Sequence, residues 1–130
     1  MPLTAEDRKQ IFDSIKSVLQ KQCPPMLVSK DKEGVYELMG NKPVPYGSKK
    51  TIIPGMYFSS VVARNDMVSF YFFPIYFHAP DFIDLIPTMA KCLKGKTCFN
   101  IKKREQVNTK ELNALLKKGV AAWKKQGYMK

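Results

Sequence analysis

Cysteine and histidine are scarce in this sequence. The chain of 130 residues has three cysteines, Cys23, Cys92 and Cys98, and one histidine, His78. An odd cysteine count without a CxxC pair argues against a disulfide framework and against a zinc site of the usual spacing. We therefore expect reduced, mostly buried thiols. Lys91 and its neighbours are expected to lower the thiol pKa of Cys92.

Long apolar runs are also missing. No stretch approaches the roughly 20 apolar residues that cross a bilayer. The first residues, Met-Pro-Leu-Thr-Ala-Glu-Asp, lack the basic and apolar pattern of a secretory signal. These features predict a cytoplasmic protein with no membrane partner.

Acidic residues number 11 against 22 basic ones, which gives a net charge of +11. Residues 1–90 hold 10 basic and 9 acidic side chains, whereas residues 91–130 hold 12 basic and 2 acidic ones. The positive charge thus belongs to the last forty residues. Such a field favours anionic partners: a small anion, an acidic protein surface or, with weaker support, nucleic acid. The alternative is a basic face that only keeps the protein in solution.

The centre of the chain predicts a β-hairpin. Residues 56–64 and 67–73 are rich in aromatic and β-branched side chains, which suit a half-buried sheet. Asn65-Asp66 between them tolerates the positive φ angles of a two-residue turn. Strict alternation would place Phe58 and Val61 on opposite faces of the first strand.

Apolar residues at helical spacing predict a helix near each end of the chain. Thr4 is the expected N-cap of the first helix, and Pro24-Pro25 ends it. Asn108 and Glu111 have the spacing of a capping box at the start of the last helix. A further helix is expected over residues 81–93, kinked or divided at Pro87.

The order of these elements predicts an α+β domain in which an N-terminal and a C-terminal helix pack on a largely antiparallel sheet. One domain is expected over residues 1–130. Residues 40–54 contain three prolines and two glycines, so we expect no regular structure there.

Four segments carry a family resemblance. They are Pro45-Tyr46-Gly47, residues 54–58, residues 68–73 and residues 93–99, the last followed by a basic helix. Together they resemble the YdhG-like family of small domains of unknown function. The resemblance implies a compact α+β fold similar to that of frataxin. Some members of the wider family are described as intracellular iron chaperones, so the resemblance also implies iron carriage as an alternative role.

The best candidate binding site lies in the irregular segment, residues 40–54. Backbone N–H groups around Gly47, the hydroxyl of Ser48 and the ammonium groups of Lys49 and Lys50 are suited to holding an anion. Aromatic side chains of the hairpin would line an apolar pocket beside it. A solvated loop and plain core packing are the alternatives. The candidate ligand-binding residues are Tyr46, Gly47, Ser48, Lys49, Lys50, Tyr57 and Tyr71.

The candidate metal ligands are fewer. Glu6, Asp7 and Asp13 cluster on the first helix, and hard cations such as iron favour carboxylate oxygen. His78 stands near two further acids, and the alternative for it is a half-exposed ring without a ligand. No general-acid, general-base or nucleophile set has a spacing typical of an enzyme.

Three functional hypotheses follow. The leading one is a cytoplasmic, non-enzymatic binding module without a cofactor, which uses a basic C-terminal face to bind a small anionic ligand or an acidic partner. The second is a frataxin-like iron chaperone. The third is an enzyme that uses His78 or a cysteine.

Overall fold

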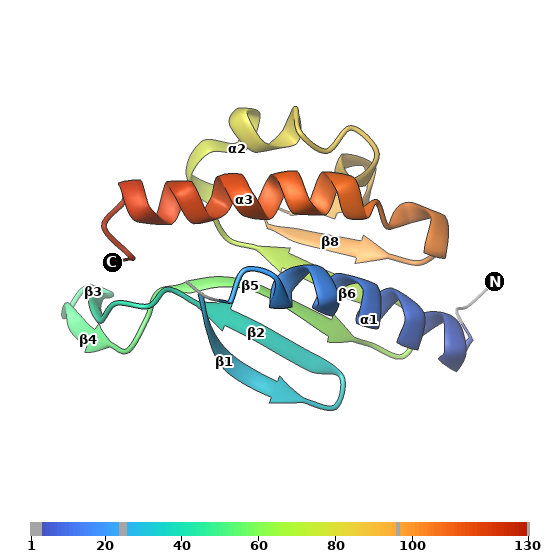
Figure 1. Cartoon of the computed structure of the whole chain (residues 1–130), viewed down its shortest axis with the longest axis horizontal. Coiled ribbons are helices and arrows are strands. Elements are labelled where there is room, and N and C mark those ends of the chain that lie inside the picture. The colour runs from blue at the N-terminus through green and yellow to red at the C-terminus, as the bar shows by residue number, and fades with distance from the viewer. Residues whose placement is uncertain (1–3, 24–25, 96, 130) are drawn as a thin grey trace.

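The computed structural model describes residues 4–23, 26–95 and 97–129, and of residues 77–79 it describes the backbone only. Two long helices, α1 and α3, lie over the same face of a six-stranded antiparallel sheet (Figure 1). The predicted α+β class is therefore confirmed. The elements are α1 (Ala5–Gln20), β1 (Leu27–Lys32), β2 (Val35–Met39), β3 (Val44–Tyr46), β4 (Thr51–Ile53), β5 (Tyr57–Ala63), β6 (Val68–Phe72), α2 (Ile75–Ile83), η1 (Met89–Cys92), β7 (Leu93–Lys94), β8 (Cys98–Ile101), η2 (Arg104–Gln106) and α3 (Thr109–Lys125).

The predicted hairpin forms the middle of the sheet. The strand order is β1-β2-β5-β6-β8-β7, so β5 and β6 are the two central strands. Ala63 pairs with Val68, and the backbone N–H of Arg64 donates to the carbonyl of Met67 at 2.8 Å. The reversal at residues 65–66 is thereby confirmed, but the positive φ expected there is wrong, because neither Asn65 nor Asp66 adopts it.

The strict alternation expected along β5 is wrong. Leu38 pairs with Ser59, but the next residue, Met39, pairs with Tyr57, so Phe58 is an extra residue in the ladder. A bulge of this kind puts two successive side chains on one side of the strand. Phe58 and Val61 are consequently both fully buried on the helix side, because pairing with β2 breaks the period of two.

Trp123 of α3 is the centre of the core beneath the helices. Its ring is fully buried and lies 5.7 Å from that of Phe58, centroid to centroid, in an edge-on arrangement. Its indole N–H donates to the carbonyl of Met56 at 3.5 Å. One turn earlier, Gly119 lets the backbone of α3 approach Phe72 closely. The last helix therefore packs directly on the central hairpin, with its buried stripe inward and its lysines outward.

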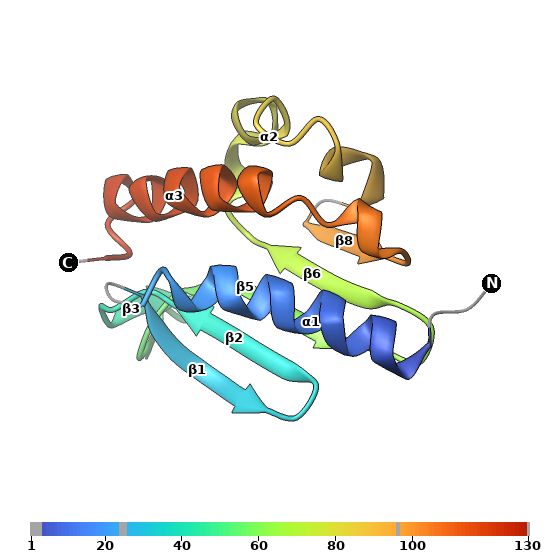
Figure 2. The same ribbon diagram turned by 45° about the vertical axis from the view of Figure 1, so that its right-hand side comes forward.

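Both long helices begin where the sequence predicts. The side chain of Thr4 accepts from the N–H of Asp7 at 3.0 Å, and Asn108 accepts from Glu111 in the same way at 3.0 Å. The two helices lie side by side in both views (Figure 2). Within the described ranges, no helix is long and apolar enough to cross a bilayer.

Two other expectations are wrong. The irregular segment contains a short hairpin, in which β3 pairs with β4 and Pro45 lies opposite Ile52. Proline is tolerated because each strand of a two-stranded ribbon has one edge without a ladder partner. The helix expected over residues 81–93 instead starts at Ile75 and ends at Ile83. Pro80 lies within α2 rather than in its first turn, and a short 3₁₀ helix, η1, follows Pro87.

Candidate functional site

The predicted anion-binding loop is the turn of the β3–β4 hairpin. Gly47 and Lys50 both have positive φ, at 83° and 53°, and the N–H of Lys50 donates to the carbonyl of Gly47 at 3.1 Å. Ser48 and Lys49 between them are exposed. The turn is closed by its own backbone, and its lysines extend into solvent.

A cavity of about 520 Å³ lies between this hairpin and the end of the main sheet. Tyr46 and Tyr57 from the predicted set line it. Its described lining does not include Tyr71 or the turn residues 47–50. The structure thus brings together two of the predicted ligand-binding residues and leaves the lysines of the turn outside. The chief side chains of the cavity wall are Glu37, Met39, Tyr46, Met56, Tyr57 and Phe73.

Tyr57 has the most constrained hydroxyl in this cavity. Its oxygen lies 2.7 Å from Oγ of Ser60, and its ring centroid lies 5.9 Å from that of Phe73. Burial raises the pKa of Tyr57 well above its usual value, and the nearby charge of Glu37 raises it further, although the bond to Ser60 acts in the opposite direction. Tyr57 is therefore neutral at physiological pH and offers a hydroxyl and a ring face.

Glu37 lines the cavity but is not among the ligand-binding residues predicted from the sequence. Its Oε2 accepts from the hydroxyl of Ser29 on β1 at 2.8 Å. No lysine or arginine in the described part of the chain forms an ion pair with it. The only sequence signal is an acidic residue in the middle of the otherwise apolar segment Val-Tyr-Glu-Leu-Met of β2.

Tyr71 belongs to a separate polar network on the face of the sheet that the helices leave uncovered. Arg64 donates to the hydroxyl of Tyr71 and, through Nε at 2.9 Å, to that of Ser69. Ser69 in turn donates to Oδ1 of Asn100 at 3.3 Å. This network joins β6 and β8 to Arg64, the residue that follows β5.

The lysines of α3 form the second candidate site. Lys110, Lys117 and Lys124 follow one another at intervals of seven residues, and Lys118 and Lys125 lie beside them. All five are exposed. None of them forms an ion pair with a described acidic residue. Lys118 is tied to α2, because its Nζ donates to the carbonyl of Asp81 at 3.0 Å.

The two acids of the basic stretch do little to offset this charge. Both oxygens of Glu111 accept hydrogen bonds from the backbone N–H of Thr88, at 3.1 and 3.2 Å. Glu105 is exposed on η2, outside α3. Arg104 is the one basic residue of the stretch with a described ion pair, at 2.8 Å to Asp7. Positive charge therefore dominates the solvent face of α3.

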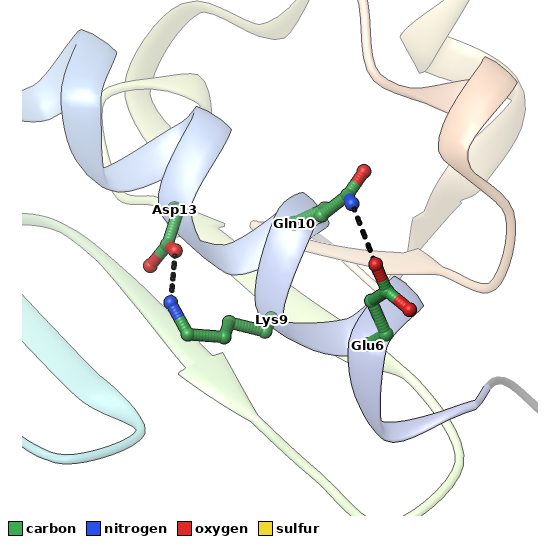
Figure 3. Close-up of polar contacts among 4 residues, drawn as sticks. All are labelled: Glu6, Lys9, Gln10 and Asp13. Carbon is green, nitrogen blue, oxygen red and sulfur yellow. Dashed lines mark hydrogen bonds and ion pairs between the residues drawn. The ribbon is translucent and has the colours of Figure 1, made fainter.

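The three carboxylates of α1 are held separately. Figure 3 shows Glu6 beside Gln10 and Asp13 beside Lys9, with donor–acceptor distances of 3.4 and 2.9 Å. Glu6 and Asp13 stand two helical turns apart, about 10 Å along the axis. Asp7 is paired with a cation of η2 instead.

No described group of three potential ligands is close enough to share a metal ion. His78 lies in α2, but its side chain is outside the described part. Iron binding by these residues stays a prediction.

The thiols differ from the sequence expectation in one respect. Burial raises the pKa of Cys92, so the expected lowering by neighbouring lysines is wrong. The reason is that desolvation disfavours the thiolate when the sulfur is buried. Burial also raises the pKa of Cys23, partly offset by a hydrogen bond with Tyr36. Both sulfurs are poor nucleophiles at neutral pH as a result.

Comparison with protein-family models, with curated proteins and with solved structures gives no match to this chain. The resemblance to YdhG-like domains therefore rests on the sequence segments alone and remains a prediction.

Proposed function

We propose that the protein is a binding module whose α3 lysines hold an acidic protein partner. The observation that carries the proposal is the row formed by Lys110, Lys117 and Lys124, hereafter the lysine row, which is exposed and without described ion pairs. Seven residues advance a helix by about 10 Å, so the row spans about 21 Å. A surface of this length suits another macromolecule better than a small anion.

The composition of α3 favours protein over nucleic acid. Lysine and arginine both bind nucleic-acid phosphates, but bidentate phosphate contacts require arginine and base stacking requires exposed aromatic rings. α3 contains no arginine, and its one aromatic residue, Trp123, is fully buried. Lysines on a rigid helix instead provide point charges that attract carboxylates and raise the rate of association.

The thiols support a non-enzymatic role, because a cysteine nucleophile needs a lowered pKa. Cys23 and Cys92 have raised pKa values, and burial is the main cause for both. The cytoplasm is the proposed compartment, which the three free cysteines support because reducing conditions keep thiols unpaired.

The proposal is tested with a fluorescently labelled glutamate-rich peptide, followed by anisotropy at several salt concentrations. The variant K110Q/K117Q/K124Q removes the lysine row. The matched control K21Q/K30Q/K32Q removes three other exposed lysines and the same net charge. We expect the row variant to bind at least about tenfold more weakly, with a shallower salt dependence, and the control to stay within about twofold.

Two results would overturn the proposal. Equal losses in both variants would mean that net charge alone attracts the peptide. Tighter binding of a single-stranded or duplex oligonucleotide than of the peptide, lost in the row variant, would assign the face to nucleic acid instead.

A further inference from the structure

The cavity beneath the β3–β4 hairpin differs in charge from the rest of this basic protein. The chain has a net charge of +11, yet the described lining includes no lysine, arginine or histidine. Its one charged residue is Glu37. That carboxylate has a neutral partner, the hydroxyl of Ser29, and its cross-strand neighbour Lys30 is exposed and forms no described ion pair with it. Negative charge in the cavity is therefore left for a ligand to neutralise.

The walls of the cavity are aromatic rings and thioethers. Tyr57 and Phe73 lie with their ring centroids 5.9 Å apart at 36° to one another. Met39 and Met56 add polarizable sulfur-containing side chains. Tyr46 stands at the hairpin side with 54% of its surface exposed. Ring faces attract cations through their quadrupole, most strongly where water is partly excluded.

Close backbone packing at the base of the hairpin fixes the shape of the cavity. The N–H of Gly40 donates to the carbonyl of Met56 at 2.9 Å. A Cβ on Gly40 would lie 2.5 Å from the carbonyl oxygen of Tyr128, and one on Gly55 would overlap the carbonyl oxygen of Gly40. Neither contact leaves room for a side chain. The two ends of the hairpin are thus held in place, so the cavity is formed before a ligand arrives.

We propose that this cavity binds a small organic cation with an alkylated ammonium group. Glu37 supplies the opposite charge, Tyr57 and Phe73 supply ring faces, and Tyr46 closes the outer side. The volume of about 520 Å³ is in the range of small-molecule sites. The neutral state of Tyr57 avoids a second negative charge while leaving its ring available. This site is separate from the lysine row and does not depend on it.

Choline is a suitable probe, because 3,3-dimethylbutan-1-ol has the same shape without the charge. Both are titrated into the ¹⁵N-labelled full chain and followed by chemical shifts of backbone amides, including that of Gly55. The variants are E37Q, which removes the charge, and Y46A, which removes an exposed ring. The control E33Q removes an exposed carboxylate that does not line the cavity.

We expect saturable choline binding that is at least about tenfold weaker for E37Q and for the uncharged alcohol, and unchanged for E33Q. Y46A should also weaken binding, and because Tyr46 is largely exposed, its loss leaves the fold intact. Absence of saturable shifts, equal binding of the alcohol, or equal affinity in E37Q and E33Q would each overturn the proposal. Loss of peptide binding in the lysine-row variant leaves these outcomes unaffected, so the two proposals can fail separately.

Discussion

The carboxylate of Glu111 in α3 accepts the backbone N–H of Met89 in η1 at 2.9 Å. This bond joins two segments 22 residues apart in sequence, and it gives η1 a charged partner at its start. It also engages one of the two acidic side chains of the C-terminal stretch in hydrogen bonds to the backbone. The same interaction therefore stabilises the fold and directs the one carboxylate of α3 toward η1.

The first prediction concerns this bond. We expect E111A to lower the free energy of unfolding by about 1–3 kcal/mol, because charged hydrogen bonds to the backbone and part of a helix cap are lost. E105A removes the same charge from an exposed position and should change stability by less than about 0.5 kcal/mol. Urea unfolding of both variants measures the difference. Equal effects would show that the contacts of Glu111 with Thr88 and Met89 do not matter.

The second prediction concerns Gly119 on the buried side of α3. A Cβ there would lie 2.5 Å from Cζ of Phe72 and 2.9 Å from Cε1 of Phe58, both in fully buried rings. Helix propensity alone favours alanine over glycine by about 1 kcal/mol. We nevertheless expect G119A to destabilise the protein by about 1–3 kcal/mol through overpacking.

A reversed substitution on the exposed side of the same helix provides the control for Gly119. A114G should cost about 1 kcal/mol by propensity alone. Propensity thus predicts opposite signs for the two variants, whereas the packing predicts that both destabilise. A more stable G119A would show that α3 does not approach Phe72 as closely as described.

The third prediction concerns alkaline pH. Burial is the main cause of raised pKa values for Tyr57, Tyr36, Cys23 and Cys92. A raised pKa means that folding favours the protonated form. This contribution is complete below the unfolded values, 9.0 for cysteine and 10.0 for tyrosine, and is lost as pH rises through the higher folded values.

We therefore expect the free energy of unfolding to fall above about pH 9. Y57F removes the most strongly shifted group, so its stability should fall less steeply with pH than that of the wild type. Urea titrations at a series of pH values between about 8 and 11 measure this slope. Identical slopes for the two proteins would mean that the hydroxyl of Tyr57 is not buried as described.

The fourth prediction concerns iron. A carrier of the frataxin kind would bind iron through Glu6, Asp7 and Asp13 and lose it in the variant E6Q/D7N/D13N. Because each of these carboxylates has a separate partner, we expect the variant and the wild type to give the same calorimetric titration with ferrous iron under anaerobic conditions. Iron binding by the wild type with a micromolar dissociation constant, absent from the variant, would instead support the iron-chaperone hypothesis.

The two long helices and the central hairpin were predictable because their signals are local. Caps at Thr4 and Asn108 act within one helical turn, and the turn at residues 65–66 depends on two residues. The bulge at Phe58 has a different origin. It arises where β5 pairs with β2, some twenty residues earlier in the chain, so alternation along β5 alone gives the wrong face.

Of the two candidate sites, one depends on local sequence and the other on contacts between distant segments. The lysine row follows from the period of one helix and was visible as a run of lysines at intervals of seven. The cavity requires β2 to pair with β5, which makes Glu37 and Tyr57 neighbours, and the β3–β4 hairpin to lie beside them. The prolines and glycines of residues 40–54 predicted irregular structure, so the β3–β4 hairpin was not expected. Without the hairpin there is no cavity beside β2, and Glu37 was therefore not predicted as a site residue.

The most direct test of the central claim is a map of where the acidic peptide binds. Backbone amide shifts of the ¹⁵N-labelled chain are recorded during titration with the glutamate-rich peptide at low salt. We expect the largest changes to fall on α3 around Lys110, Lys117 and Lys124, and added salt to reverse them. Changes centred on the β3–β4 hairpin or on β1, with α3 unaffected, would contradict it.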